Sequence, residues 1–276
     1  MIQLLKLPLA FIYFYFECKK SPVNGDRIKW TDLYSFLIKV RWFSIISGSK
    51  RDVSLRFLKY NLCASDYISL ENLFHEIFVS GEYHYAENEF KPEVIFDCGA
   101  NIGMTTLFFK ILYPDVKIRA FEPNPKAFYY LNKNITSNNL LNVFPYQVAL
   151  SDTNGEMELF FDNENLVTGS LNNGREIFNH SVTVKTAKLS DYIAQEARID
   201  ILKMDVEGAE HIILAELAKT GLLQKPSRYL IEYHNFEIVD TYIEFLSLFA
   251  KLSYCVQFGS NINRKKNYQD VLIYLN

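Results

Sequence analysis

From residue 92 onward, short apolar runs alternate with longer stretches in which apolar residues recur every three or four positions. The short runs have the length and composition of buried strands, and the stretches between them have the periodicity of amphipathic helices. The predicted strands are residues 94–96, 117–121, 142–148, 199–204, 229–233, 254–258 and 271–275, and the predicted helices are residues 103–112, 125–137, a segment after Gly208, and 240–251. This alternation predicts an α/β fold with a doubly wound, mostly parallel sheet covered on both faces.

The N-terminal third of the chain lacks this alternation. Residues 31–43 and 70–78 carry apolar residues at helical spacing, and Phe and Tyr are frequent throughout the region. The sequence therefore predicts two parts, a helical, aromatic-rich N-terminal region at residues 1–90 and an α/β domain at residues 91–276.

A polar connection interrupts the α/β pattern between the predicted strands 142–148 and 199–204. Residues 157–161 and 182–186 have strand character, and they flank a stretch rich in Asn and Gly at residues 162–173. A long polar connection of this kind is either a mobile loop beside an active site or a plain surface excursion. The sequence leaves both interpretations open.

The segment at residues 4–16, LLKLPLAFIYFYF, is apolar apart from one lysine. It is shorter than the roughly 20 residues that a bilayer span needs. It also lacks the charged n-region and the small-residue cleavage site of a signal peptide. We interpret it as a helix or strand packed on the core, with an aromatic interfacial membrane anchor followed by Lys19 and Lys20 as the alternative. A cytoplasmic protein is expected, with peripheral membrane contact through residues 4–16 as the alternative.

Composition narrows the function classes. Hydrophobic residues make up 49% of the chain and charged residues 22%, which is typical of a globular protein and excludes a disordered or fibrous one. The formal net charge of −3 supplies no basic field for nucleic acid, so no nucleic-acid partner is expected. Cys18, Cys63, Cys98 and Cys255 form neither a C-x-x-C pair nor a zinc pattern, and we interpret them as free thiols of a reducing compartment.

The first strand-to-helix turn carries the clearest binding signal. It reads VIFDCGANIG, with Asp97 before two glycines, Gly99 and Gly103, in G-x-x-x-G spacing rather than the G-x-G-x-x-G of dinucleotide-binding turns. A carboxylate at this place repels a pyrophosphate but suits a ligand with an ammonium or sulfonium group, such as S-adenosylmethionine. Glu122 closes the next strand and can accept hydrogen bonds from ribose hydroxyls. Together these residues predict a nucleoside site, although each alone is also common in ordinary turns and strand ends.

Acidic residues and a histidine follow the fourth and fifth strands. Asp205 and Glu207 end one strand, and Glu232 and His234 share a face at the end of the next. Such groups can take the proton of an attacking hydroxyl, with His234 as the first choice for the base and Asp205 as the second. Alternatively, Asp205 and Glu207 cap the following helix or hold a magnesium ion. No metal is predicted, and Lys203 is interpreted as an ion-pair partner of neighbouring acids.

Four segments together resemble one family. They are FDCGANIGMTT, AFEPNPKAFYYLNKNITSNN, YQVALSD and IDILKMDVEGAE, and they occur in the order found in the FkbM family of S-adenosylmethionine-dependent methyltransferases. The resemblance covers roughly residues 80–275, and its most diagnostic part is KMDVEGAE at residues 203–210. Departures are Met104-Thr105, where an aromatic pair is common, and Ala215-Glu216, where a glycine often stands.

The resemblance implies a Rossmann-like, seven-stranded class I methyltransferase sheet with a helical N-terminal extension, and S-adenosylmethionine as the cofactor. Asp97 would face the methionine ammonium through water, Glu122 would hold the ribose, and Ala149 would border the adenine. The implied cofactor-binding residues are Asp97, Gly99, Asn101, Gly103, Glu122, Pro123, Asn124 and Ala149. The implied catalytic residues are His234, Asp205, Glu232 and Glu207.

The leading hypothesis is therefore an O-methyltransferase that acts on a hydroxyl of a sugar, glycan or secondary metabolite, so that its partner is a small-molecule or glycan acceptor. Two alternatives stay open. One is a nucleotide (NAD)-dependent oxidoreductase on a Rossmann-like fold, against which the glycine spacing and Asp97 count. The other is a non-catalytic, membrane-associated binding protein that keeps the fold.

Overall fold

The computed structural model describes residues 7–47, 52–84, 90–161, 169–170, 180–234, 239–250, 252, 254–258 and 268–275. The chain forms two compact units. The first comprises Met1–Lys91, Ile102–Pro114 and Tyr129–Leu141, and the second comprises Pro92–Asn101, Asp115–Phe128 and Asn142–Asn276. The roles expected for residues 1–90 and 91–276 stay predictions.

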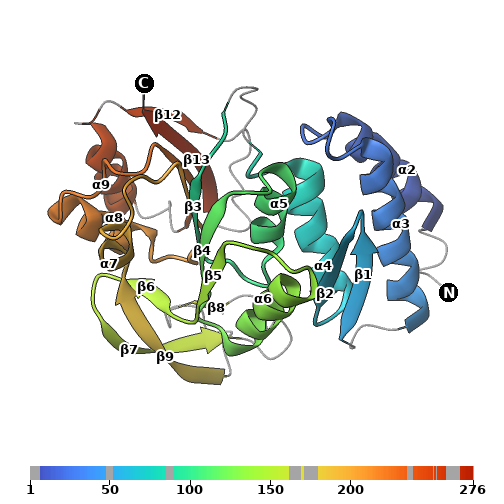
Figure 1. Ribbon diagram of the computed structural model, residues 1–276, viewed down its shortest axis with the longest axis horizontal. Coiled ribbons are helices and arrows are strands. Elements are labelled where there is room, and N and C mark those ends of the chain that lie inside the picture. Colours follow the sequence, from blue (N-terminus) through green and yellow to red (C-terminus); the bar gives the residue numbers. More distant parts are fainter. Residues whose placement is uncertain are drawn as a thin grey trace. The chain divides into compact units, whose positions relative to one another are not determined.

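The second unit contains a seven-stranded sheet with the order β12-β13-β11-β10-β3-β4-β5. Figure 1 labels its strands β12, β13, β3, β4 and β5. Its strands are β3 (Val94–Cys98), β4 (Lys117–Phe121), β5 (Val143–Tyr146), β10 (Ile201–Met204), β11 (Arg228–His234), β12 (Tyr254–Phe258) and β13 (Tyr268–Leu275). Neighbouring strands from β11 to β5 run parallel, whereas β13 pairs antiparallel with β11 and β12 pairs antiparallel with β13. The α/β sheet predicted from the alternation of strands and helices is confirmed.

A hydrophobic core joins this sheet to helices α7 (Leu189–Ile193), α8 (Glu210–Lys219) and α9 (Val239–Ala250). Alternate residues of β3, namely Val94, Phe96 and Cys98, belong to the core, as the two-residue period of a strand requires. Tyr233 of β11 stacks on Phe245 of α9 with ring centroids 4.4 Å apart. This packing fixes the positions of the carboxyl ends of β3, β10 and β11 in the sheet. Asp205 and Glu207 come directly after β10.

A second, four-stranded sheet has the order β6-β9-β7-β8. Its strands are β6 (Ala149–Ser151), β7 (Gly155–Phe161), β8 (Gly169–Ser170) and β9 (His180–Lys188). The strand predicted at 142–148 ends at Tyr146, because the chain then leaves the first sheet and pairs β6 in parallel with β9. The strands predicted at 157–161 and 182–186 are confirmed within β7 and β9. The polar stretch 162–173 lies outside the described residues except for β8.

The first unit contains helices and one hairpin. Its elements are α2 (Leu7–Lys20), α3 (Trp30–Ser47), β1 (Val53–Phe57), β2 (Tyr60–Ala64), α4 (Tyr67–Phe74), the π-helix η1 (His75–Ser80) and α5 (Met104–Leu112), while α6 (Pro125–Ser137) is shared by the two units. The hairpin was not predicted, because Leu58 and Lys59 between β1 and β2 are not the Asn or Gly residues that signal a tight turn. Leu58 nevertheless takes φ +51°. The N-terminal region is therefore not purely helical.

Helix α2 contains most of the apolar segment predicted at 4–16, and residues 4–6 lie outside the described residues. Phe14 and Cys18 are buried, whereas the side chains at the i, i+3, i+4 and i+7 positions of the opposite face are at least half exposed. They are Leu9, Ile12, Tyr13 and Phe16. In the described ranges, no helix has both the length and the hydrophobicity that crossing a bilayer requires. Peripheral membrane contact stays a prediction. Cys18, Cys63, Cys98 and Cys255 form no disulfide bond in the described part of the chain, and the reducing compartment stays a prediction.

Candidate functional site

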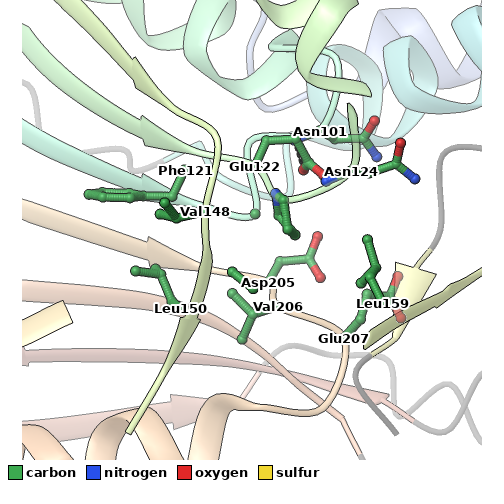
Figure 2. Close-up of a pocket in the computed structure, with 13 residues that line it drawn as sticks. Asn101, Phe121, Glu122, Asn124, Val148, Leu150, Leu159, Asp205, Val206 and Glu207 are labelled. Carbon is green, nitrogen blue, oxygen red and sulfur yellow. Dashed lines mark hydrogen bonds between the residues drawn. The ribbon is translucent and has the colours of Figure 1, made fainter. Parts of the chain in front are cut away.

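A pocket opens at the carboxyl ends of β3, β4 and β10 in the second unit. Its volume is about 600 Å³, which includes solvent space at the open mouth. Figure 2 shows Glu122, Asn101 and Asn124 on one side and Asp205 and Glu207 on the other. The pocket is lined by Gly99, Asn101, Phe121, Glu122, Pro123, Asn124, Val148, Ala149, Leu150, Leu159, Asp205, Val206 and Glu207.

The glycine turn after β3 approaches the backbone that follows β10. These two strands pair in parallel, and the N–H of Asp205 donates to the carbonyl of Cys98 over 3.0 Å. Gly99 has φ +80°, and a Cβ added to it would lie only 1.7 Å from the carbonyl oxygen of Asp205. Glycine is therefore required at this position both for its backbone conformation and for the close approach.

Glu122 is a buried carboxylate at the edge of the pocket. Its two oxygens accept hydrogen bonds from the backbone N–H groups of Asn101 and Asn124, each over 2.8 Å. Burial raises the pKa of Glu122 to about 7, although these two hydrogen bonds and Lys203 act in the opposite direction. The carboxylate thus ties the glycine turn to the end of β4 and keeps lone pairs for a hydroxyl donor in the pocket.

Lys203 lies on β10 and is almost completely buried. Its Nζ donates to the carbonyl of Gly99 over 2.7 Å and lies 3.5 Å from Oδ1 of Asp97 and 3.7 Å from Oδ2 of Asp205. Burial alone would lower the pKa of Lys203, but Asp205 and Asp97 outweigh it and raise this pKa above its ordinary value. The interpretation of Lys203 as an ion-pair partner of neighbouring acids is confirmed.

Two of the expected cofactor-binding residues do not line the pocket. Asp97 is completely buried beside Lys203. Gly103 belongs to the first unit, has φ +84°, and could not carry a Cβ without bringing it to 2.7 Å from Cδ1 of Leu131. Both positions therefore have a structural role, and their contact with a cofactor stays a prediction.

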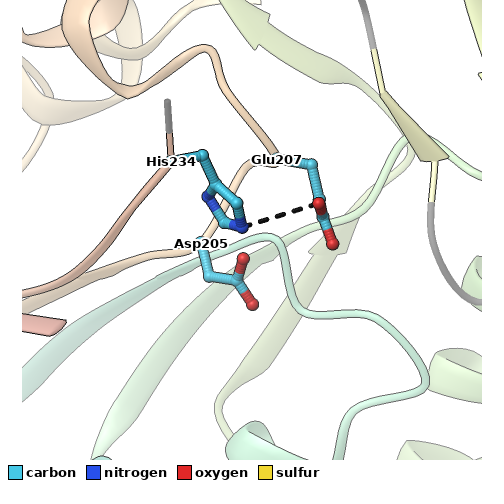
Figure 3. Close-up of side chains that lie close together, drawn as sticks. All are labelled: Asp205, Glu207 and His234. Atoms are coloured by element: carbon cyan, nitrogen blue, oxygen red, sulfur yellow. Dashed lines mark ion pairs between the residues drawn. The ribbon is translucent and has the colours of Figure 1, made fainter. Parts of the chain in front are cut away.

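Asp205, Glu207 and His234 converge at the ends of β10 and β11 (Figure 3). His234 is buried, and its Nε2 lies 3.5 Å from Oε2 of Glu207 and 3.7 Å from Oε1 of Glu232. The expectation that Glu232 and His234 share a face of their strand is confirmed by the second distance. The other ring nitrogen of His234, Nδ1, lies 2.9 Å from Oε1 of the fully buried Glu210.

The carboxylates around His234 determine its charge state. Burial lowers the pKa of His234, but Glu210, Asp205 and Glu207 outweigh burial and raise it to about 10. His234 therefore carries a proton near neutral pH, so it would have to lose that proton before acting as a base. Its role as the base stays a prediction.

The turn between β10 and α8 has a strained backbone. Glu207, which is not a glycine, has φ +56°, a conformation that costs on the order of 1–3 kcal/mol and is found mostly at functional sites. The N-cap residue Ala209 makes no side-chain hydrogen bond to α8. Glu210 instead accepts from the N–H of Gly208 over 3.1 Å. Glu210 therefore contributes to the capping of α8, and a capping role for Asp205 and Glu207 stays an alternative.

Most of the expected site residues meet at the pocket. Those that line it are Gly99, Asn101, Glu122, Pro123, Asn124, Ala149, Asp205 and Glu207, and those that do not are Asp97, Gly103, Glu232 and His234. Sequence reasoning missed the apolar wall, because Phe121, Val148 and Leu159 have no pattern that separates them from core residues. It also missed Glu210, whose only signal is its place at the first residue of a helix.

Comparison with known proteins gives the family. The profile described as "Methyltransferase FkbM domain" matches residues 97–256. Methyltransferase sdnD of Sordaria araneosa is 32% identical over 178 residues, which cover 53% of this chain and 68% of that protein. The 31-O-demethyl-FK506 methyltransferase FkbM of Streptomyces tacrolimicus is 31% identical over 174 residues, covering 52% and 66%. The 2-O-methyltransferase NoeI of Sinorhizobium fredii is 29% identical over 167 residues, covering 54% and 67%.

The match spans more than half of the chain, and it includes the glycine turn, the carboxylate that closes β4 and the acidic turn after β10. These are the segments that build the pocket. The chain belongs to the FkbM family of methyltransferases.

Proposed function

We propose that the protein transfers a methyl group from S-adenosylmethionine to a hydroxyl oxygen of a small-molecule or glycan acceptor. The observation that carries this proposal is the buried carboxylate of Glu122 beside the turn at Gly99, in a pocket at the carboxyl ends of parallel strands. Ligands of open α/β sheets bind at this edge, and an acid that closes the second strand can hold a ribose.

The lining residues fit S-adenosylmethionine. Glu122 accepts from the ribose hydroxyls, and the apolar wall around Val148, Leu150 and Leu159 offers a surface for the adenine. The backbone at Gly99 and Asn101 lies open to the methionine end. When bound, S-adenosylmethionine supplies a sulfonium methyl group that an acceptor oxygen takes as the carbon–sulfur bond breaks, while the acceptor proton passes to a base.

The acceptor side of the pocket is formed by the turn after β10. Asp205 and Glu207 line the pocket opposite Glu122 (Figure 2). Oδ1 of Asp205 is buried and accepts no hydrogen bond from the described part of the chain. We assign Asp205 as the group that takes the acceptor's proton, because it faces the pocket and His234 does not. A hydroxyl acceptor is supported by the names of two relatives, a 31-O-demethyl-FK506 methyltransferase and a 2-O-methyltransferase.

Thermal unfolding with S-adenosylhomocysteine, and separately with NAD, tests the cofactor. Ligand at about 100 times its dissociation constant adds about 2.7 kcal/mol, which raises the unfolding temperature by roughly 5–10 °C for a chain of this size. We expect the rise with S-adenosylhomocysteine alone. A rise with NAD alone would favour the oxidoreductase, and no rise with either ligand would favour a non-catalytic protein.

The affinity for S-adenosylhomocysteine is expected to fall as the pH is lowered through 7. The ionised carboxylate of Glu122 accepts from both ribose hydroxyls, and its pKa of about 7 means that acid progressively removes this form. The dissociation constant measured by calorimetry should therefore be about tenfold higher at pH 6 than at pH 8.

The variant Glu122→Gln separates this effect from other titrations. It should bind more weakly at pH 8 and show little change between pH 6 and pH 8, whereas Glu156→Gln, which alters an exposed acid on β7, should behave like the natural chain. A pH dependence that persists in Glu122→Gln would show that another group is responsible.

A further inference from the structure

We propose that Asp205, Glu207 and His234 form a binding site for one divalent metal ion at the acceptor side of the pocket. One possible ligand atom from each side chain lies within 4.8 Å of the other two (Figure 3). Two ligand atoms that each lie about 2.0–2.2 Å from a cation such as Zn²⁺ are about 3.3–4.4 Å apart, depending on the angle between them. The three side chains therefore need to close by up to about 1.5 Å to coordinate one ion.

The surroundings of His234 have the arrangement found around metal-binding histidines. The Nδ1–H group of His234 donates a hydrogen bond of 2.9 Å to the buried carboxylate of Glu210. This hydrogen bond fixes the orientation of the ring and directs Nε2 toward Glu207, 3.5 Å away. A metal ion bound there displaces the proton from Nε2 into solvent, while Nδ1 keeps its hydrogen bond to Glu210. A carboxylate behind a histidine is the usual second partner of a metal-ligating imidazole. Glu210 is therefore a positioning residue for this site.

Several carboxyl groups surround the proposed position of the ion. Among the described residues, the ion pairs at the ends of β3, β10 and β11 join more carboxyl groups than cationic groups. The carboxyl groups are those of Asp97, Asp205, Glu207, Glu210 and Glu232, and the cationic groups are those of Lys203 and His234. Much of this cluster is buried, where electrostatic attraction is strong. A divalent ion between Asp205 and Glu207 would be attracted by both carboxylates.

Two local features support the same position. Oδ1 of Asp205 is buried and accepts no hydrogen bond within the described ranges, and a metal ion would satisfy it. The left-handed backbone at Glu207 places a carboxylate, 28% exposed, beside Nε2 of His234. This backbone strain is an observation separate from the contact between His234 and Glu210. It is explained if the strained conformation is needed to bring the Glu207 carboxylate to a bound ion.

The donor set indicates which ion is preferred. Two carboxylates and one imidazole suit Mn²⁺ or Zn²⁺ better than Mg²⁺, which favours oxygen ligands only. Asp205 and Glu207 also line the pocket, so an acceptor oxygen could complete the coordination. With the metal ion on Oδ1 of Asp205, its other oxygen, Oδ2, would be the one that takes the acceptor's proton. That last role rests on the proposed methyl transfer, whereas binding of the ion does not.

The test is titration of the full chain, freed of metal by chelation and without S-adenosylmethionine, with Mn²⁺. Binding is followed by calorimetry and by loss of the electron paramagnetic resonance signal of the free ion. We expect one Mn²⁺ per chain and an affinity that falls about tenfold or more in Glu207→Gln and in Asp205→Asn. Glu156→Gln, which removes an exposed acid outside the cluster, should bind as the natural chain does.

Glu207→Asp distinguishes coordination from simple attraction of charge. It keeps the charge but withdraws the carboxylate by one methylene, so it should also weaken Mn²⁺ binding. No Mn²⁺ binding, or equal binding by the natural chain and Glu207→Gln, or full binding by Glu207→Asp, would overturn the proposal. Thermal stabilisation by S-adenosylhomocysteine, measured on the same samples, separates the metal site from the proposed function. If the natural chain binds Mn²⁺ but is not stabilised by S-adenosylhomocysteine, the proposed cofactor is contradicted and the metal site is not.

Discussion

Replacing Gly99 with alanine is expected to lower the unfolding temperature by about 10 °C and to abolish stabilisation by S-adenosylhomocysteine. The added Cβ would lie 1.7 Å from the carbonyl oxygen of Asp205, a backbone atom that cannot rotate away. Overpacking of this kind costs about 1–3 kcal/mol, and the φ of +80° adds about 1 kcal/mol for any residue with a side chain. The ends of β3 and β10 must then separate, and the pocket between Gly99 and Asp205 is lost with them.

Two other glycines of the same unit are matched controls for Gly99→Ala. Gly221 has φ +73° but no atom within 4 Å of an added Cβ, so Gly221→Ala measures the cost of backbone conformation alone. Gly155→Ala has only an ordinary 3.8 Å contact with Thr186 and should change little. The unfolding temperature of Gly99→Ala should therefore be far below those of Gly221→Ala and Gly155→Ala. Equal losses in Gly99→Ala and Gly221→Ala would show that the close approach to Asp205 does not constrain the fold.

The order of strands and helices could be predicted because buried parallel strands and amphipathic helices have different periods. The hairpin between β1 and β2 could not, since its turn at Leu58 takes a left-handed conformation without the residues that normally announce one. The end of β5 was misplaced because the pairing of Ala149 with β9 depends on a partner more than thirty residues away. Local patterns do not record such pairings.

The site residues that could be predicted from the sequence are the charged ones that directly follow an apolar strand. Glu122 and Asp205 are charged residues directly after apolar strands, so their place at the sheet edge follows from the topology. Leu159 lines the pocket from β7 in the other sheet, and nothing in the sequence relates it to Glu122. The role of Glu210 depends on the distance between its carboxylate and His234, which requires the fold.

Replacing Lys203 with methionine is expected to destabilise the protein by about 3–5 kcal/mol. Methionine fills a similar volume, but it leaves the fully buried Asp97 without its cationic partner at 3.5 Å and removes the hydrogen bond to Gly99. Removing one partner of a buried ion pair lowers the free energy of unfolding more than replacing both partners does, because the remaining charge stays desolvated. Chemical denaturation at constant pH measures the loss.

The double variant Lys203→Met/Asp97→Asn shows where that loss comes from. If the buried charge of Asp97 is the cause, the double variant should recover a substantial part of the stability, because Asp205, the other carboxylate that loses Lys203, is partly exposed to solvent. If the lost hydrogen bond to Gly99 is the cause, the double variant should be as unstable as Lys203→Met. Glu93→Gln, which alters an exposed pair with Arg198 at 3.3 Å, should leave stability unchanged, since solvent screens that pair. Recovery in the double variant would establish that Lys203 compensates the buried carboxylate of Asp97 beneath the glycine turn, and so that the pocket is shaped by a buried ion pair.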